Sequence, residues 1–287
     1  MVVKLALPNK GRLQEPAIRL LEDAGIGAVD REQKQLFART SDSELELVFV
    51  RAQDIPSLVA KGAADLGVTG YDLVRESGVD VAEVLDLGFG FARLVVAAHE
   101  KTGIKYVRDI RAGARVATEF PNLATKYFAK RGLKVELVRV SGAAEITPFV
   151  GVAELIVDLT STGTTLRTHG LRVVDELFET SARLIVNRKS LRQKRAKIEE
   201  VKTALSSVIR ARGRKLILMN VPEAKLAAIK RIVPGMAGPT VSRVEAKKPM
   251  LAVQAVVEAN KVYEIVQRAK KAGARDILVV PIERILP

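Results

Sequence analysis

The sequence contains no cysteine, no tryptophan and only two histidines, His99 and His169, among its 287 residues. Disulfides, thiol catalysis and cysteine-ligated metal or iron–sulfur sites are therefore excluded, and two histidines are too few for a multi-histidine zinc site. A divalent metal would need oxygen ligands, which favours magnesium brought in with a phosphate. Aromatic residues make up only 4% of the chain, so the core must consist mainly of Val, Leu, Ile and Ala.

The sequence also lacks a long apolar segment. Its longest stretch without a charge, Ile232–Ser242, is too short and too rich in Pro and Gly to span a bilayer. Lys4 and Lys10 interrupt the N-terminal segment, which therefore has no apolar core of signal-peptide length. We expect a cytoplasmic protein with no membrane partner. The length suits about two domains and a small third.

Positive charge is concentrated in one part of the chain. The net charge is +14, and the segment Val186–Arg231 holds 14 Lys and Arg against 3 Asp and Glu. Such a stretch is either a nucleic-acid footprint or the solvated face of a helix, and the second interpretation is favoured. Since the sequence has neither an aromatic platform nor a recognised nucleic-acid motif, we expect no nucleic-acid partner.

Short apolar runs alternate with helical patterns over the first 160 residues. Strands are predicted over Val2–Leu7, Leu45–Val50, Asp65–Thr69, Leu94–Ala98, Arg115–Thr118, Val135–Val140 and Leu155–Leu159. Helices are predicted over Leu13–Ala24, Asp54–Lys61 and Asn122–Arg131. The alternation predicts parallel sheets covered on both faces. Because a second series begins after Phe89 and Gly90, we expect two α/β lobes with a cleft at the carboxyl ends of the strands.

The rest of the chain has a different pattern. Apolar residues at helical spacing predict one long amphipathic helix over Leu191–Arg210, and Gly213 ends it. The following segments predict the order β-α-β-β-α-β, a ferredoxin-like unit: Lys215–Val221, Glu223–Ile232, Thr240–Val244, Leu251–Val257, Lys261–Ala272 and Asp276–Ile282. Small domains of this kind, appended to enzymes, often bind regulators.

The most informative segment is Glu154–Leu166, with the sequence ELIVDLTSTGTTL. An apolar strand ends at Asp158, and four hydroxyl residues then surround Gly163, which allows a tight turn with inward-pointing N–H groups. Ser161, Thr162, Thr164 and Thr165 provide hydroxyl donors suited to a phosphate, and a helical turn would add its positive end. The alternative is a Ser/Thr turn that only caps a helix. The segment is not a Walker loop, because no Gly-Lys-Ser/Thr follows.

Several co-linear motifs carry a family resemblance. Residues 145–171, EITPFVGVAELIVDLTSTGTTLRTHGL, resemble the phosphoribosyl-pyrophosphate loop of the ATP phosphoribosyltransferases. LALPNKGRL (Leu5–Leu13), DLGVTGYDL (Asp65–Leu73) and RVATEFPNL (Arg115–Leu123) also resemble this family's motifs, in its order. PGMAGPTVS (Pro234–Ser242) and ILVVPIER (Ile277–Arg284) are similar to the regulatory domain of the long form. Glu154 and His169 are mild departures from the pattern.

The resemblance implies a fold and a reaction. The fold is α/β, a two-lobed catalytic core like that of periplasmic binding proteins with a C-terminal ferredoxin-like (ACT-like) regulatory domain. Lobe I would comprise residues 1–90 and 178–190, lobe II 91–177, the connecting helix 191–212 and the regulatory domain 213–287. The reaction transfers phosphoribosyl from 5-phosphoribosyl 1-pyrophosphate to N1 of ATP, with Mg²⁺ as cofactor. L-histidine would inhibit, and dimers would assemble into hexamers.

The resemblance also assigns roles to residues. Glu145, Asp158, Ser161, Thr162, Gly163, Thr164 and Thr165 would bind phosphoribosyl pyrophosphate; Lys10, Arg12, Arg51 and Asp72 would bind ATP; Met236 and Thr240 would bind histidine; Glu145 and Asp158 would reach the metal through substrate or water. Without the resemblance, each of these residues also has a purely structural interpretation. Lys10 and Arg12 would lie in a solvated turn, and Arg51 would be a surface cation. Asp72 would cap a helix, and Glu145 would be a loop carboxylate. We expect no acid or base catalyst, and no catalytic role for either histidine.

Three other classes of protein share some of these features. A solute-binding protein shares the two-lobed shape but needs an export signal. A nucleic-acid-binding module would explain the basic segment. A non-catalytic paralogue should lack the intact STGTT loop, which this sequence retains.

Overall fold

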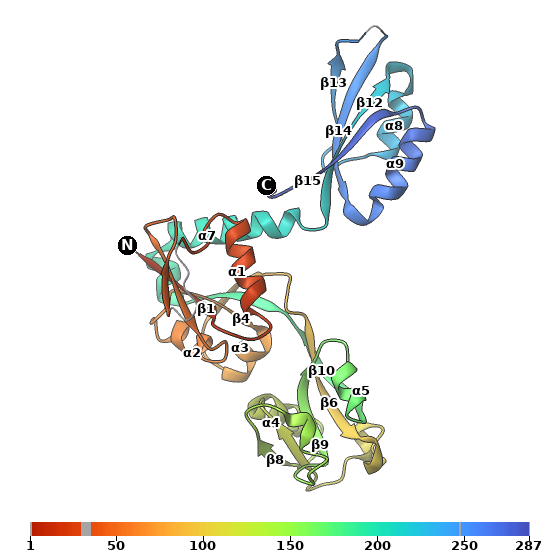
Figure 1. Cartoon of the computed structure of the whole chain (residues 1–287). Helices are drawn as coiled ribbons and strands as arrows, with labels where there is room; N and C mark the ends of the chain where they lie inside the picture. The colour runs from red at the N-terminus through yellow and green to blue at the C-terminus, as the bar shows by residue number, and fades with distance from the viewer. Residues whose placement is uncertain (1, 30–35, 247, 287) are drawn as a thin grey trace. The chain divides into compact units, whose positions relative to one another are not determined.

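The computed structural model describes residues 2–29, 36–246 and 248–286. The chain divides into two compact units, Met1–Lys202 and Thr203–Pro287. No helix in the described ranges is long and apolar enough to cross a membrane. The first unit contains two sheets and the second unit contains one (Figure 1).

The first sheet has six strands in the order β2-β3-β1-β4-β11-β5. Its strands are β1 (Val3–Pro8), β2 (Phe37–Arg39), β3 (Leu45–Val50), β4 (Leu66–Gly70), β5 (Ala82–Asp86) and β11 (Ala182–Val186), and its helices are α1 (Gln14–Asp23), α2 (Ile55–Ala60) and α3 (Tyr71–Ser77). β1 pairs in parallel with β3 and β4, so three central strands end at the same edge. Helix α2 packs its buried Ile55 and Val59 closely over β4, where a side chain on Gly67 would overlap Ile55.

The second sheet has five strands in the order β10-β6-β9-β7-β8. Its elements are β6 (Ala92–His99), β7 (Arg115–Thr118), α4 (Pro121–Lys130), β8 (Glu136–Arg139), β9 (Leu155–Thr160), α5 (Thr164–Thr168) and β10 (Leu171–Thr180), with short 3₁₀ turns at Glu100–Thr102, Val107–Asp109 and Ala144–Ile146. Here β7 is parallel to β8 and to β9. One apolar cluster joins α4 to the sheet, and a second cluster around Leu166 covers another part of it.

The second unit forms the sheet β13-β14-β12-β15. Its elements are β12 (Arg214–Pro222), α8 (Leu226–Ile232), β13 (Thr240–Val244), β14 (Met250–Glu258), α9 (Val262–Lys271) and β15 (Arg275–Pro281), with 3₁₀ turns at Glu223–Lys225 and Ala259–Lys261. The buried residues Ile229 of α8 and Ile265 of α9 belong to the apolar core of this sheet. The β-α-β-β-α-β order is therefore confirmed, as is the α/β class with a two-lobed core and a ferredoxin-like C-terminal domain.

Three expectations from the sequence were wrong in part. The two sheets of the first unit are mixed, because β6 and β11 run antiparallel to their neighbours. The strands β2, β5, β10 and β11 were not predicted; charged residues and two irregularities in register obscure the pattern of β10. The helix predicted over Leu191–Arg210 is two helices, α6 (Arg188–Gln193) and α7 (Arg195–Ala211). They are separated at Lys194, whose ammonium donates to the Asp65 carboxylate and the Val2 carbonyl, each at 2.8 Å.

Candidate functional site

The residues that follow three parallel strands of the first sheet line one cavity. Lys10 and Arg12 follow β1, Arg51 follows β3, and Asp72 lies two residues beyond β4. All four border a cavity of about 370 Å³. Ligands in α/β proteins bind at this edge because successive strands deliver their loops there. The structure therefore brings together the four residues that the resemblance assigns to ATP.

Asp72 lies beneath the rim of this cavity. Its side chain is 1% exposed, and its Oδ1 lies 3.6 Å from Nη2 of Arg12. The same oxygen accepts a hydrogen bond of 2.6 Å from the hydroxyl of Thr180. Arg12 is half-exposed and also donates from Nη1 to the carbonyl of Gly90. The Asp72 carboxylate is thus paired with one of the cations that line the cavity, Arg12.

The second sheet supplies the other side of the same cavity. Glu119 and Phe120 follow β7, Ser141 follows β8, and Leu159 lies near the end of β9. Glu119 was not predicted as a site residue, although its place between a strand and Pro121 was a usable signal. Partial burial raises its pKa, and the nearby Glu145 adds to the shift. The first sheet thus contributes cations to the cavity, and the second sheet's side contributes the carboxyl group of Glu119.

The hydroxyl-rich segment forms a compact turn directly after β9. Gly163 has φ = +72°, a left-handed conformation that glycine adopts without strain. Its N–H donates to the hydroxyl of Thr160 at 3.0 Å. Arg167, which the sequence analysis did not single out, donates to the Thr162 carbonyl and the Thr164 hydroxyl, each at 3.2 Å. Ser161, Thr162, Thr164 and Thr165 are exposed residues. The Ser161 hydroxyl donates to the Phe91 carbonyl at 3.3 Å, and the hydroxyls of Thr162 and Thr164 lie 2.9 Å apart within the turn.

The carboxyl groups around β9 repel one another. Burial raises the pKa of Asp158 to about 6, and the charges of Glu145 and Glu119 add to this effect. Such mutual repulsion is relieved by a cation or by hydroxyl donors, and carboxylate oxygens are the ligands that Mg²⁺ prefers. No group of three His, Asp or Glu in the described part of the chain could hold a metal alone. The carboxylates of Asp158 and Glu145 are oxygen donors, so their chemistry fits Mg²⁺.

The chain is similar to known proteins of one family. A model of the ATP phosphoribosyltransferase family matches residues 51–207. Proteins called ATP phosphoribosyltransferase from Methanocella arvoryzae and Methanocaldococcus jannaschii are each 51% identical to this chain, over 99% of it and 100% of their own length. The chain belongs to the ATP phosphoribosyltransferase family. It is therefore an enzyme of the phosphoribosyltransferase type, as the sequence resemblance predicted.

A second match identifies the long form of this family. A model of the HisG C-terminal domain matches residues 211–284. The solved ATP phosphoribosyl transferase (HisG:HisZ) complex from Thermotoga maritima has a chain that is 30% identical, with a TM-score of 0.63. The match covers 71% of this chain and 99% of that one. The unmatched share of this chain is consistent with a further domain in the long form.

The two departures from the phosphoribosyltransferase pattern have structural roles. The Glu154 carboxylate accepts from Nη2 of Arg115 at 2.7 Å, from Nε at 3.2 Å and from the Arg115 backbone N–H at 2.7 Å. It thereby joins the starts of β7 and β9. His169 and His99 both lie edge-on to the ring of Phe149, at centroid distances of 6.1 and 5.0 Å. Both histidines are therefore part of an aromatic contact.

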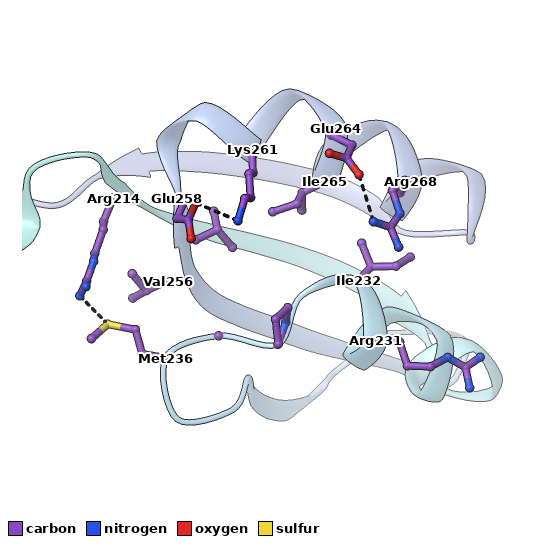
Figure 2. Close-up of a pocket in the computed structure, with 13 residues that line it drawn as sticks. Arg214, Arg231, Ile232, Met236, Val256, Glu258, Lys261, Glu264, Ile265 and Arg268 are labelled. Atoms are coloured by element: carbon purple, nitrogen blue, oxygen red, sulfur yellow. Dashed lines mark hydrogen bonds and ion pairs between the residues drawn. The ribbon is translucent and has the colours of Figure 1, made fainter.

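The C-terminal domain has a cavity of its own, of about 360 Å³. Figure 2 shows two ion pairs on one side, Glu258 with Lys261 and Glu264 with Arg268. Met236 lies opposite, with its Sδ 3.4 Å from Nη1 of Arg214. Of the two residues predicted to bind histidine, Met236 lines this cavity, whereas Thr240 begins the exposed strand β13 and is outside the lining.

Proposed function

We propose that this chain transfers the phosphoribosyl group of 5-phosphoribosyl 1-pyrophosphate to N1 of the adenine of ATP, which is the first step of histidine biosynthesis. The observation that supports this most is the two-sided cavity. Its cationic side suits the triphosphate of ATP, and its other side includes Glu119 and Leu159. Asp158 precedes Leu159 on β9, and the hydroxyl turn suited to a ribose phosphate follows that strand. Family membership makes this reaction the expected one.

The reaction joins adenine N1 to C1 of the ribose while the bond from C1 to the pyrophosphate oxygen breaks, and its electron pair leaves with pyrophosphate. Holding two large anions in line is most of the task. Lys10, Arg12 and Arg51 would hold the triphosphate. The turn Ser161–Thr165 would hold the 5′-phosphate, and positive charge near the leaving oxygens would stabilise the transition state.

Asp158 and Glu145 would accept hydrogen bonds from the ribose hydroxyls or bind Mg²⁺. When bound, the metal would neutralise charge on the departing pyrophosphate. Neither carboxylate needs to remove a proton, since adenine N1 is already a nucleophile with a free lone pair. The proposed transfer therefore needs no acid or base catalyst.

The decisive experiment is an assay of ATP with 5-phosphoribosyl 1-pyrophosphate, with and without Mg²⁺. We expect Mg²⁺-dependent release of pyrophosphate and formation of N1-(5-phosphoribosyl)-ATP. No pyrophosphate release from the two substrates, together with salt-sensitive binding of RNA, would overturn the proposal in favour of a nucleic-acid-binding protein.

Replacing Arg51 with alanine tests the cationic side. None of the described residues offers its guanidinium a carboxylate within ion-pair distance, so the loss should not lower the melting temperature. Removing a charge-assisted bond to phosphate costs about 1.5–3 kcal/mol, which predicts a rise of roughly ten- to hundredfold in the KM for ATP. Arg19→Ala is a matched control, because Arg19 pairs with Glu15 on the surface of α1. A KM for ATP that is unchanged in Arg51→Ala would contradict the assignment.

We also propose that L-histidine binds at residues 234–240 of the C-terminal domain and inhibits the enzyme without competing with phosphoribosyl pyrophosphate. A tight turn supports this, since a side chain on Gly235 would lie 2.7 Å from the carbonyl oxygen of Gly238. The cavity beside Met236 carries both signs of charge, as a zwitterion requires. Assembly into dimers and hexamers remains a prediction, and a ligand on a separate domain would act by shifting an equilibrium between such states.

Thr240→Ala should raise the histidine concentration that gives half inhibition about fivefold, because a lost neutral hydrogen bond is worth about 1 kcal/mol. The uninhibited turnover number should not change, since Thr240 lies on the edge strand of a separate unit. Inhibition curves at several substrate concentrations measure both quantities. Competition between histidine and phosphoribosyl pyrophosphate would contradict this regulatory role.

A further inference from the structure

The two sheets of the first unit are joined by two chain crossings, and each crossing contacts a residue of the proposed ATP site. The first crossing runs from β5 to β6 through Gly90, whose carbonyl accepts from Arg12. The second runs from β10 to β11 through Thr180 and Ser181. Thr180 contacts Asp72, which is 108 positions away in the sequence.

The contact between Thr180 and Asp72 is reciprocal and buried. The Thr180 hydroxyl donates to Oδ1 of Asp72 at 2.6 Å and accepts from the Asp72 backbone N–H at 3.0 Å. The two residues are 2% and 1% exposed. Next to them, the Tyr71 N–H donates to the Ser181 carbonyl at 2.9 Å. A buried carboxylate has lost its hydration, so this hydroxyl bond determines how it is oriented.

Gly70 makes room for this orientation. The Asp72 carboxylate folds back over the start of α3, and a β-carbon on Gly70 would overlap Oδ1 and lie 3.1 Å from Cγ. The backbone of Gly70 has φ = −75°, which any residue can adopt. The glycine is therefore needed for the space that the carboxylate occupies.

We infer that Thr180 is a positioning residue for the ATP site: its hydroxyl fixes the Asp72 carboxylate so that Oδ1 faces Arg12, and it ties that pair to the crossing between the lobes. The inference rests on the proposed function, because it takes this cavity as the ATP site. The second crossing thereby holds the carboxylate while the first holds the arginine. A change in the angle between the lobes would then alter the pair that faces the nucleotide.

Thr180→Val removes the hydroxyl and keeps the shape of the side chain. We expect the KM for ATP to rise about tenfold, with the KM for 5-phosphoribosyl 1-pyrophosphate changed less than twofold. Thr180→Ser should restore the KM for ATP, because serine supplies the same donor and acceptor. Thr40→Val is the matched control: Thr40 is 8% exposed and bonds the Asp42 and Leu45 carbonyls, outside the cavity lining. It should lower the melting temperature and leave both KM values unchanged.

Gly70→Ala displaces the same carboxylate without touching Thr180, and it should also raise the KM for ATP. Equal KM values for ATP in wild type, Thr180→Val and Gly70→Ala, alongside a raised value in Arg51→Ala, would overturn this inference alone. If Thr180→Val raises both KM values equally and serine does not rescue it, the role is structural and the inference is wrong. An unchanged KM for ATP in Arg51→Ala as well would remove the proposed ATP site and the inference with it.

Discussion

Replacing Asp158 with asparagine should stabilise the fold above pH 6 and at the same time remove most of the activity. Burial, with added repulsion from Glu145 and Glu119, raises the pKa of Asp158 from 3.8 to about 6. The folded state therefore holds this proton more tightly than the unfolded state does. In the wild type the contribution of Asp158 to stability falls as the pH rises from about 4 to 6, and it is constant above that range.

The asparagine side chain keeps the shape and removes the charge. Since one pH unit in pKa corresponds to about 1.4 kcal/mol, ionised Asp158 destabilises the wild type by about 3 kcal/mol at neutral pH. Urea denaturation at pH 7.5 should show a gain approaching that value for Asp158→Asn, and the gain should shrink as the pH falls towards 4. Activity should fall at least a hundredfold in kcat/KM for 5-phosphoribosyl 1-pyrophosphate, about 2.7 kcal/mol, because the carboxylate would contact the ribose or its metal.

Asp109 offers a control, because its pKa is shifted in the opposite direction to that of Asp158. Its carboxylate accepts hydrogen bonds from the backbone N–H groups of Lys105 and Tyr106, which lower its pKa. Asp109→Asn should therefore lose stability at neutral pH and keep full activity. If Asp158→Asn also loses stability at pH 7.5, the carboxylate is held by favourable contacts and the account of a repelled group is wrong.

The sequence predicted best the residues that directly follow a short apolar strand. Lys10, Arg12 and Arg51 follow β1 and β3, and parallel strands bring such residues to one edge without any knowledge of the loops. The hydroxyl turn at Gly163 was predicted for the same reason, since it follows the apolar strand β9. Local pattern was sufficient there because strand ends and turns are set by neighbours in the sequence.

Features that depend on distant contacts were not predictable in this way. At the break between α6 and α7, Lys194 contacts Asp65, which is 129 positions away. The bond between Thr180 and Asp72 joins β10, a strand missed from the sequence, to α3. Ala143 has φ = +50°, a conformation uncommon for alanine, just before the 3₁₀ turn that carries Glu145. Each of these features involves tertiary contacts, which cannot be predicted from hydrophobic periodicity along the sequence.

Gly163→Val should raise the KM for 5-phosphoribosyl 1-pyrophosphate more than tenfold, a loss of at least about 1.4 kcal/mol. Valine is branched at Cβ and disfavours the left-handed backbone that Gly163 adopts. Its β-carbon would also lie 3.1 Å from Nη1 of Arg167, the group that bonds the Thr162 carbonyl. The substitution therefore both strains the turn and displaces the side chain that holds it.

A control substitution at a second glycine distinguishes an effect of backbone strain from loss of the proposed phosphate site. Gly103 has the same φ of +72°, and beyond its chain neighbours none of the described residues has an atom within 4 Å of its β-carbon position, so Gly103→Val introduces the strain without a clash. Both variants should lose stability in thermal denaturation, but only Gly163→Val should bind 5-phosphoribosyl 1-pyrophosphate weakly in direct calorimetric titration. The KM for ATP should change less than twofold in each, because Gly163 is outside the lining of the cavity proposed to bind ATP. A folded Gly163→Val enzyme that binds 5-phosphoribosyl 1-pyrophosphate like wild type would show that the turn only caps α5.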